Sequence, residues 1–133
     1  MTGVELYLLY RDKSWRWPNG AGRMESEGRR FVAWSGTGES ASWAEGRWVV
    51  TDTGRLCMDA TWHSQAEAAT DRTCFSHRKH GDTIYQKKEP SGDWYVFDNP
   101  GSQGELEKLV GEDLVSAELK KLKSTIPAAP PET

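Results

Sequence analysis

Residues 43–75, WAEGRWVVTDTGRLCMDATWHSQAEAATDRTCF, decide the fold of this chain. The G-x-W pattern that ends at Trp48 lies in an alternating run, and the T-D-T-G segment at 51–54 is a hairpin turn, so two strands meet here. A third strand follows and carries the second cysteine. Gly46 lies two residues before Trp48 on the same strand face, and a glycine inside a strand marks a bend, a bulge or the close approach of another backbone.

Further short strands extend on both sides of this stretch. Turn signals such as Pro18-Asn19-Gly20 recur at intervals of about 8 to 12 residues, which is typical of an all-β barrel or sandwich. Because the connections are short, neighbouring strands are expected to pair. We predict a small antiparallel up-and-down barrel of lipocalin-like shape. Its strands are expected at 14–17, 21–26, 30–35, 42–50, 55–63, 72–79, 83–89 and 94–97, with a polar loop or an irregular hairpin end at 64–71.

Helical patterns flank the strands at the two ends of the chain. Thr2 and Glu5 form a capping box, in which each side chain accepts a hydrogen bond from the other's backbone amide, and they predict a helix over 3–11. Near the other end, apolar residues recur at helical spacing and predict a C-terminal helix; they are Val115, Leu119, Leu122 and Ile126. We expect one domain over 1–126 and a flexible Pro-rich tail over 127–133.

The composition argues against several classes of function. The chain has 133 residues and a formal net charge of −3, whereas non-specific nucleic-acid binding needs a basic surface. No apolar run approaches the ~18 residues of a membrane-spanning helix. The first residues show no signal peptide, which fits either a cytoplasmic protein or the mature part of an exported one. We expect no cofactor, no nucleic acid and no membrane span, and a monomer or weak dimer.

Seven tryptophans are spread over nearly every predicted strand, and they are the most informative residues for function. Three have apolar or small neighbours on the same face and are predicted to lie in the core: Trp15, Trp48 and Trp94. Four others lie beside turns or polar residues, where an amphipathic ring can offer one face to a ligand. We predict that these four line the mouth of the barrel as ligand-binding residues: Trp17, Trp34, Trp43 and Trp62.

Catalytic and metal-binding patterns are weak. Asp59, His63 and His77 form the polar set that favours a hydrolase, but the sequence contains no G-x-S-x-G or H-E-x-x-H. A zinc site would need both cysteines together with His77 and His80, at a spacing unlike the familiar patterns. Residues 74 and 77 also point to opposite faces of a strand. We therefore expect no metal site and assign no catalytic residue.

Cys57 and Cys74 face each other if their strands form a symmetric hairpin, so they form either a disulfide or two buried thiols. The runs GRRFVAWSG, ASWAEGRWVVTDTGRLC, TCFSHR and TIYQKKEPSGDWYVF resemble a small alpha-proteobacterial family of exported proteins known only as a domain of unknown function. The resemblance covers residues 3–123 and rests on the pattern G-x-W…L-C…W…C. It implies a β-rich fold in an oxidising compartment, and it thereby favours the disulfide. It implies no activity.

Three hypotheses about function follow. The leading one is a non-enzymatic periplasmic or secreted protein that binds a small amphipathic or sugar-like ligand at an aromatic barrel mouth, with a cytoplasmic location as the alternative. The second is a protein-interaction or inhibitor module that acts through one barrel face. The third is a hydrolase that uses Asp59 with His63 or His77. A binder predicts a concave pocket lined by several tryptophans, an interaction module a filled core with a flat aromatic patch, and an enzyme a cleft of converging polar groups.

Overall fold

One antiparallel sheet makes up most of the structure, which is a computed structural model that describes residues 1–101 and 104–127. Within these residues the sheet has nine strands in the order β8-β7-β6-β5-β4-β3-β2-β1-β9. The strands are β1 (Lys13–Trp17), β2 (Gly20–Met24), β3 (Arg30–Ser35), β4 (Ser42–Val50), β5 (Arg55–Ser64), β6 (Ala68–His80), β7 (Thr83–Lys88), β8 (Tyr95–Asp98) and β9 (Leu109–Val110). The first eight pair in chain order, and β9 returns to pair with β1.

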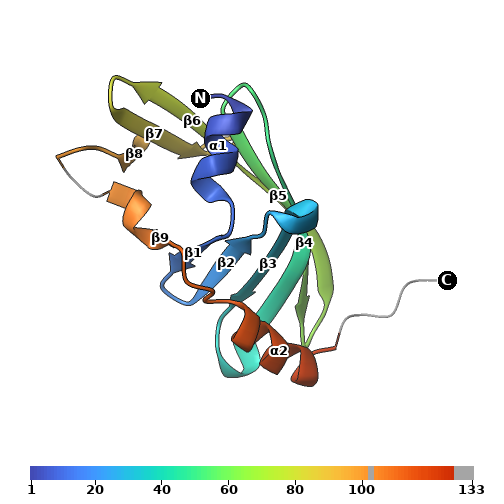
Figure 1. Cartoon of the computed structure of the whole chain (residues 1–133). Coiled ribbons are helices and arrows are strands. Elements are labelled where there is room, and N and C mark those ends of the chain that lie inside the picture. Colours follow the sequence, from blue (N-terminus) through green and yellow to red (C-terminus); the bar gives the residue numbers. More distant parts are fainter. Residues whose placement is uncertain (102–103, 128–133) are drawn as a thin grey trace.

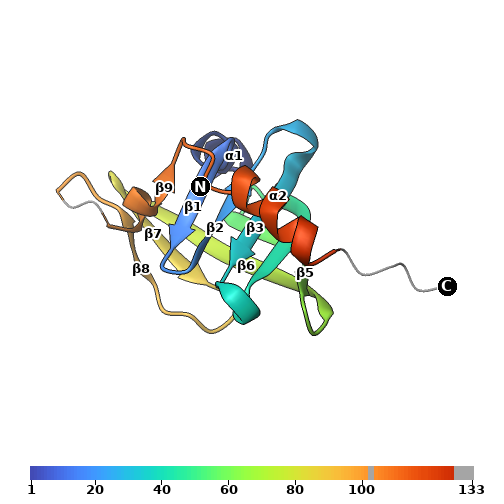
Figure 2. The same ribbon diagram turned by 90° about the horizontal axis from the view of Figure 1, so that it is seen from below.

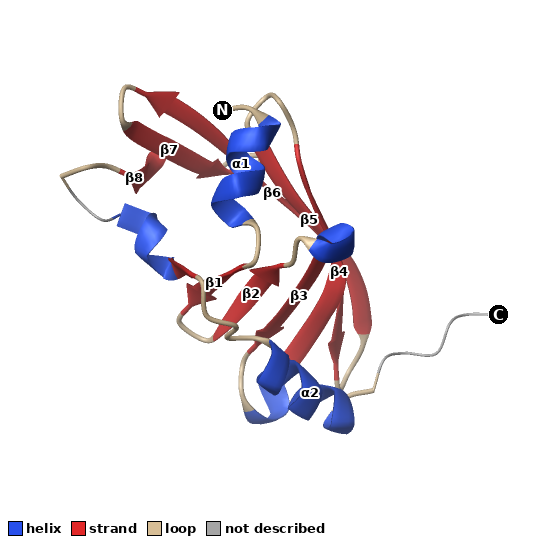
Figure 3. Cartoon of the chain, in the orientation of Figure 1, coloured by secondary structure: helices blue, strands red, loops and turns tan. Residues whose placement is uncertain are grey.

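The sheet curls into a half-barrel whose two edge strands are β8 and β9 (Figure 1, Figure 3). The short 3-10 helix η3 (Gly104–Lys108) packs against β8 and β1 and bridges the two ends of the curl. The predicted antiparallel up-and-down fold with a helix at each end is therefore confirmed, as a curled half-barrel.

The N-terminal helix α1 (Gly3–Tyr10) lies in the hollow of the half-barrel (Figure 1). The predicted capping box is present: Thr2 Oγ1 accepts from the Glu5 amide at 3.2 Å, and Glu5 Oε1 accepts from the Thr2 amide at 3.0 Å. A helix of eight residues is marginal by itself. Its docking is provided by Leu6 and Tyr10, whose side chains are fully buried against the sheet.

Alternation along the strands divides the sheet into two apolar faces. The concave face and α1 form the larger cluster, whose members include Leu6, Tyr10, Met24, Phe31, Trp48, Leu56, Met58, Phe97 and Leu109. The convex face forms a second cluster beneath the C-terminal helix, with Ala21, Val32, Ala41, Trp43, Val115, Leu119 and Ile126. Because side chains on a strand alternate with period two, neighbours in sequence enter different clusters.

Gly46 is required where β4 and β5 approach closely. It pairs with Ala60 across the ladder, and a Cβ at this position would overlap the backbone carbonyl oxygen of Asp59 and the Cα of Ala60. Any side chain would push the two strands apart. Of the three possibilities that a glycine in a strand leaves open, Gly46 therefore marks the close approach of another backbone.

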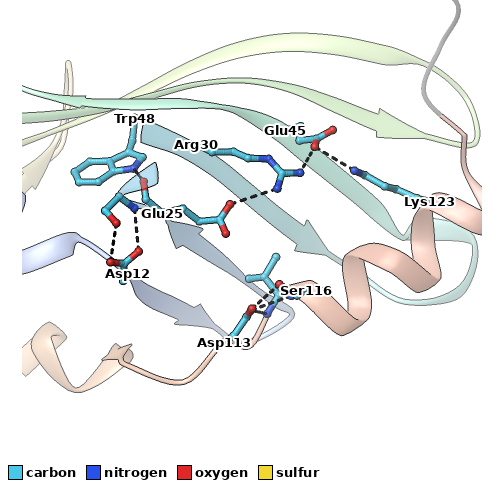
Figure 4. A network of polar contacts seen from close by, with 10 residues as sticks. Asp12, Glu25, Arg30, Glu45, Trp48, Asp113, Ser116 and Lys123 are labelled. Atoms are coloured by element: carbon cyan, nitrogen blue, oxygen red, sulfur yellow. Dashed lines mark hydrogen bonds and ion pairs between the residues drawn. The ribbon is translucent and has the colours of Figure 1, made fainter. Parts of the chain in front are cut away.

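The C-terminal helix α2 (Ser116–Thr125) packs on the convex side of β3 and β4 (Figure 1, Figure 2). Leu119 is buried within the helix, and Val115 and Ile126 are buried at its two ends, as the predicted apolar face requires. Lys123 of α2 pairs with Glu45 of β4 at 3.1 Å, and Glu45 in turn pairs with Arg30 of β3 (Figure 4). This chain of charges lies at the side of the helix and ties it to two strands.

Three details differ from expectation or lie beyond the structure. Residues 68–71 are not a loop but the start of β6, where Thr61 and Thr70 oppose each other and extend the ladder. Trp94 is not in the core: it precedes β8 and is 37% exposed. The predicted flexible tail over 127–133 lies, apart from Pro127, outside the described residues.

Candidate functional site

The hollow of the half-barrel is filled at one end by α1 and contains a cavity of about 290 Å³ at the other. Strands β1, β3, β5 and β6 contribute its apolar wall, which consists of Trp15, Trp17, Phe31, Met58, Ala60, Trp62 and Phe75. Strand β1, strand β6 and η3 contribute its polar groups, which are Arg16, Asp71, Thr73, Glu105 and Lys108. A concave, mostly apolar site with a few polar groups is the usual form of a small-molecule site.

The aromatic wall is positioned by small residues beneath it. The added Cβ of an alanine at Gly22 would lie 2.9 Å from the Phe31 ring and 3.3 Å from the Trp17 ring, so both rings lie directly over this glycine of β2. Trp15 packs against Phe75 with ring centroids 5.0 Å apart. On its other side Trp15 contacts the buried rings of Tyr10 and Phe97, with centroids 5.9 and 6.4 Å away.

The polar groups at the cavity carry both signs of charge. Lys108 pairs with Glu105 of the same 3-10 helix at 2.8 Å. Arg16 donates to the backbone carbonyl of Glu107 at 3.3 Å. The hydroxyl of Thr73 lies 3.5 Å from the Asp71 carboxylate, at the limit of a hydrogen bond. Opposite charges are balanced around the opening, so the site has no strong preference for either sign.

A buried polar network lies between the aromatic wall and α1. The carbonyl of Gly54 accepts from Nδ1 of His77 at 2.9 Å, which leaves Nε2 as an acceptor for the Tyr10 hydroxyl at 2.7 Å. The amide nitrogen of Gln86 donates to the Tyr10 oxygen at 2.9 Å, and its carbonyl oxygen accepts from the Tyr95 hydroxyl. Every member of this network is paired, as buried polar groups must be.

The network is uncharged at neutral pH. Burial lowers the pKa of His77 to about 4. Burial also raises the pKa of Tyr10 well above its usual value, and it raises the pKa of Tyr95 to about 12. His77 is only 3% exposed and lies beneath Tyr10, so it is enclosed by protein and does not face the cavity.

The structure brings together two of the four tryptophans expected at a barrel mouth. Trp17 and Trp62 line the cavity. Trp34 and Trp43 are cross-strand neighbours on the convex face, where their indole N–H groups donate to the carbonyls of Leu114 and Ile126 at 2.9 and 2.7 Å. The expectation of one rim of four tryptophans is therefore corrected, because the period of the strands turns Trp34 and Trp43 away from the hollow. Trp43 is buried beneath α2, whereas Trp34 is half-buried and lines a second pocket beside that helix.

Several cavity residues were not expected from the sequence. Trp15 was predicted to lie in the core, yet it shares a strand face with Trp17 and borders the cavity. Phe75 and Thr73 lie on the same face of β6 and could have been found by counting in steps of two from the buried His77. The contribution of η3 had no local signal, since it follows from the curl of the sheet.

Asp59, His63 and His77 do not form a site. Asp59 lies on the convex face and pairs with Arg72 at 3.4 Å. His63 lies on the same face but stacks on Trp43 with ring centroids 4.3 Å apart. His77 lies on the concave face beneath Tyr10. Among residues 1–101 and 104–127 no group of three His, Cys, Asp or Glu side chains is arranged to hold a metal ion.

Cys57 and Cys74 lie directly opposite each other in the ladder of β5 and β6 and are joined by a disulfide. Both residues are buried on the convex face, on the other side of the sheet from the cavity. The bond links the two longest strands, from near the start of β5 to the middle of β6. The helices in the described part of the chain are all too short or too polar to cross a membrane.

Comparison with known proteins identifies a family and no characterised relative. A family model described as "Protein of unknown function (DUF995)" matches residues 1–115, which include the whole sheet. No curated protein and no solved structure matches the chain.

Proposed function

We propose that this chain, which belongs to the DUF995 family of proteins of unknown function, is an exported, non-enzymatic protein that binds a small amphipathic ligand in the hollow of its half-barrel. The observation that carries the proposal is the cavity of about 290 Å³, with Trp15, Trp17 and Trp62 in its wall. Its volume is near the lower end of the range for small-molecule sites. The ligand is therefore small and has a substantial apolar face.

The arrangement of the two sheet faces favours a binder over the alternatives. An interaction module would fill the hollow and present a flat aromatic patch. Here the hollow remains partly open, and the most exposed tryptophan in the described part of the chain, Trp94, is only 37% exposed. A hydrolase would need Asp59 close to His63 or His77. On the convex face Asp59 pairs with Arg72 and His63 stacks on Trp43, while His77 is buried on the concave face.

The disulfide supports export. Disulfides persist in oxidising compartments such as the periplasm and are rare in the cytoplasm of mesophiles. Cys57 and Cys74 are the two cysteines of the chain and they are bonded to each other. A periplasmic or secreted location follows as part of the proposal.

Titration with the uncharged amphipathic dye N-phenyl-1-naphthylamine tests the proposal. We expect fluorescence enhancement on binding, and about tenfold weaker binding to Trp62→Ala, which corresponds to ~1.4 kcal/mol of lost contact with one indole. Trp94→Ala is the matched control, because it removes an indole that lies outside the cavity. Equal dye binding by Trp62→Ala and the unmodified protein would show that the hollow is not the binding site.

A further inference from the structure

The indole N–H groups of the tryptophans fall into two classes. The N–H groups of Trp34, Trp43 and Trp48 each donate to a backbone carbonyl, at 2.9, 2.7 and 2.7 Å. The three tryptophans of the cavity wall have no acceptor among the described residues, and none of their N–H groups is buried away from solvent. The cavity wall therefore contains three indoles, those of Trp15, Trp17 and Trp62, whose N–H groups have no protein acceptor among the described residues.

Unused donors in the wall disfavour a hydrocarbon ligand. An alkyl chain in the cavity would offer the N–H groups no acceptor, and it would cost free energy for each of these groups that it removed from solvent. A ligand with oxygen atoms next to an apolar face would keep the contact with the rings and also satisfy the donors.

The remaining polar groups favour an uncharged ligand with both donors and acceptors. Glu105 and Lys108 neutralise each other, which leaves one cation, Arg16, and one anion, Asp71, on the polar side of the cavity. The Asp71 carboxylate accepts hydrogen bonds, and the Thr73 hydroxyl can both donate and accept. An ionic head group would meet one favourable and one unfavourable charge.

From these contacts we infer that the ligand is an uncharged carbohydrate, bound with a C–H face of one pyranose ring against the indoles and with its hydroxyl groups toward the N–H donors, Thr73 and Asp71. The inference rests on the proposed function and specifies the chemical class of its ligand. A volume of about 290 Å³ is the space of roughly ten water molecules, so the cavity accepts one ring at a time.

Isothermal titration of the full chain with matched alkyl ligands tests the inference. The probes are the octyl glycosides of glucose, galactose, mannose and N-acetylglucosamine, each below its micelle concentration, with 1-octanol as the ligand that lacks the sugar. We expect at least one octyl glycoside to bind more tightly than 1-octanol. Methyl glycosides then distinguish the source of the sugar: comparable binding indicates a free saccharide, and loss of binding indicates the head group of a glycolipid.

Substitutions that remove an N–H but keep an aromatic ring provide the second measurement. Trp17→Phe and Trp62→Phe should each weaken binding of the preferred glycoside about three- to tenfold more than they weaken binding of 1-octanol. Trp94→Phe, outside the cavity, should change neither affinity. If 1-octanol binds as tightly as every glycoside, the carbohydrate inference is wrong while ligand binding in the hollow stands. If neither 1-octanol nor any glycoside binds, the proposed function is wrong as well.

Discussion

The hydroxyl of Tyr10 donates a hydrogen bond to Nε2 of His77 across 2.7 Å, and neither side chain has appreciable contact with solvent. Tyr10 is the last residue of α1, and His77 lies on the concave face of β6. The bond joins the helix that fills one end of the hollow to the strand that also forms a wall of the cavity. The packing of the helix therefore depends on His77 remaining an acceptor at this atom.

Acid should destabilise the fold through His77. Its pKa is about 4 in the folded chain, against 6.5 for the ordinary side chain, so between these values the unfolded chain binds a proton that the folded chain does not. The free energy of unfolding should be highest above pH 6.5 and should fall by roughly 3 kcal/mol as the pH decreases to 4. Urea unfolding at several pH values measures this loss.

His77→Gln should be less stable at pH 7 but should lose less stability between pH 6.5 and 4. His80→Gln, at an exposed position of the same strand, is the matched control. Its free energy of unfolding should change with pH as it does in the unmodified protein. If His77→Gln lost as much unfolding free energy between pH 6.5 and 4 as the unmodified protein, the acid sensitivity would belong to other groups.

Tryptophans of the core and of the cavity should respond differently to truncation. Trp48 is fully buried, stacks on Tyr7 and donates to the Glu25 carbonyl, so Trp48→Ala should lower the free energy of unfolding by about 3 to 5 kcal/mol. Trp17→Ala should cost less, because one side of that ring borders a cavity. Denaturant unfolding gives both values, and acrylamide quenching of single-tryptophan variants should show Trp17 as the more accessible. Equal shielding of the two rings would contradict a solvent-filled cavity.

The disulfide should be complete in protein exported to the periplasm. Alkylation without reductant should then leave the intact mass unchanged, and alkylation after denaturation and reduction should modify both Cys57 and Cys74. Reduction should also lower the free energy of unfolding by about 3 kcal/mol, the chain-entropy value for a loop of this size. The double variant Cys57→Ala/Cys74→Ala is the control, since it should be insensitive to reductant. Two alkylated thiols in unreduced periplasmic material would exclude the bond.

Docking of α2 should contribute to stability through its buried face. Leu119→Ala should lower the free energy of unfolding by about 2 to 3 kcal/mol, because the side chain packs over the convex face. Lys120→Ala, at the next and exposed position, should have little effect. Deletion of residues 127–133 should be tolerated, whereas deletion from Gly111 onward should uncover Trp43. An unchanged melting temperature after the longer deletion would show that the helix is not needed.

Much of the architecture was predictable because its signals are local. The capping box of Thr2 and Glu5, the alternation that carries Cys57 and Cys74 to one face, and the helical spacing of Val115 and Leu119 are each set by a few neighbouring residues. Backbone geometry converts such patterns into helices, strands and register without reference to distant parts of the chain. The glycine at position 46 marked a bend, a bulge or a close backbone approach, and only the pairing with β5 selects the last of these.

The candidate site was predictable only in part. Alternation alone shows that Trp43 and Trp48 of β4 face opposite sides of the sheet, yet it does not show which side is hollow. Proximity to a turn, which suggested that Trp43 was open to ligands, was a poor guide to its exposure. Trp43 is buried beneath α2 and donates to the carbonyl of Ile126, 83 residues away in the chain, while Trp34 remains half-buried.

By itself the sequence determined the first eight antiparallel strands and their pairing in chain order, the placing of Cys57 and Cys74 opposite each other, and a helix at each end, because these depend on period and spacing. The tertiary structure alone decided which face became a cavity. The curl of the sheet brings η3 beside β1, α1 fills one end of the hollow, and α2 covers the opposite face. These contacts join segments far apart in sequence, so no local pattern records which indole rings remain free to meet a ligand.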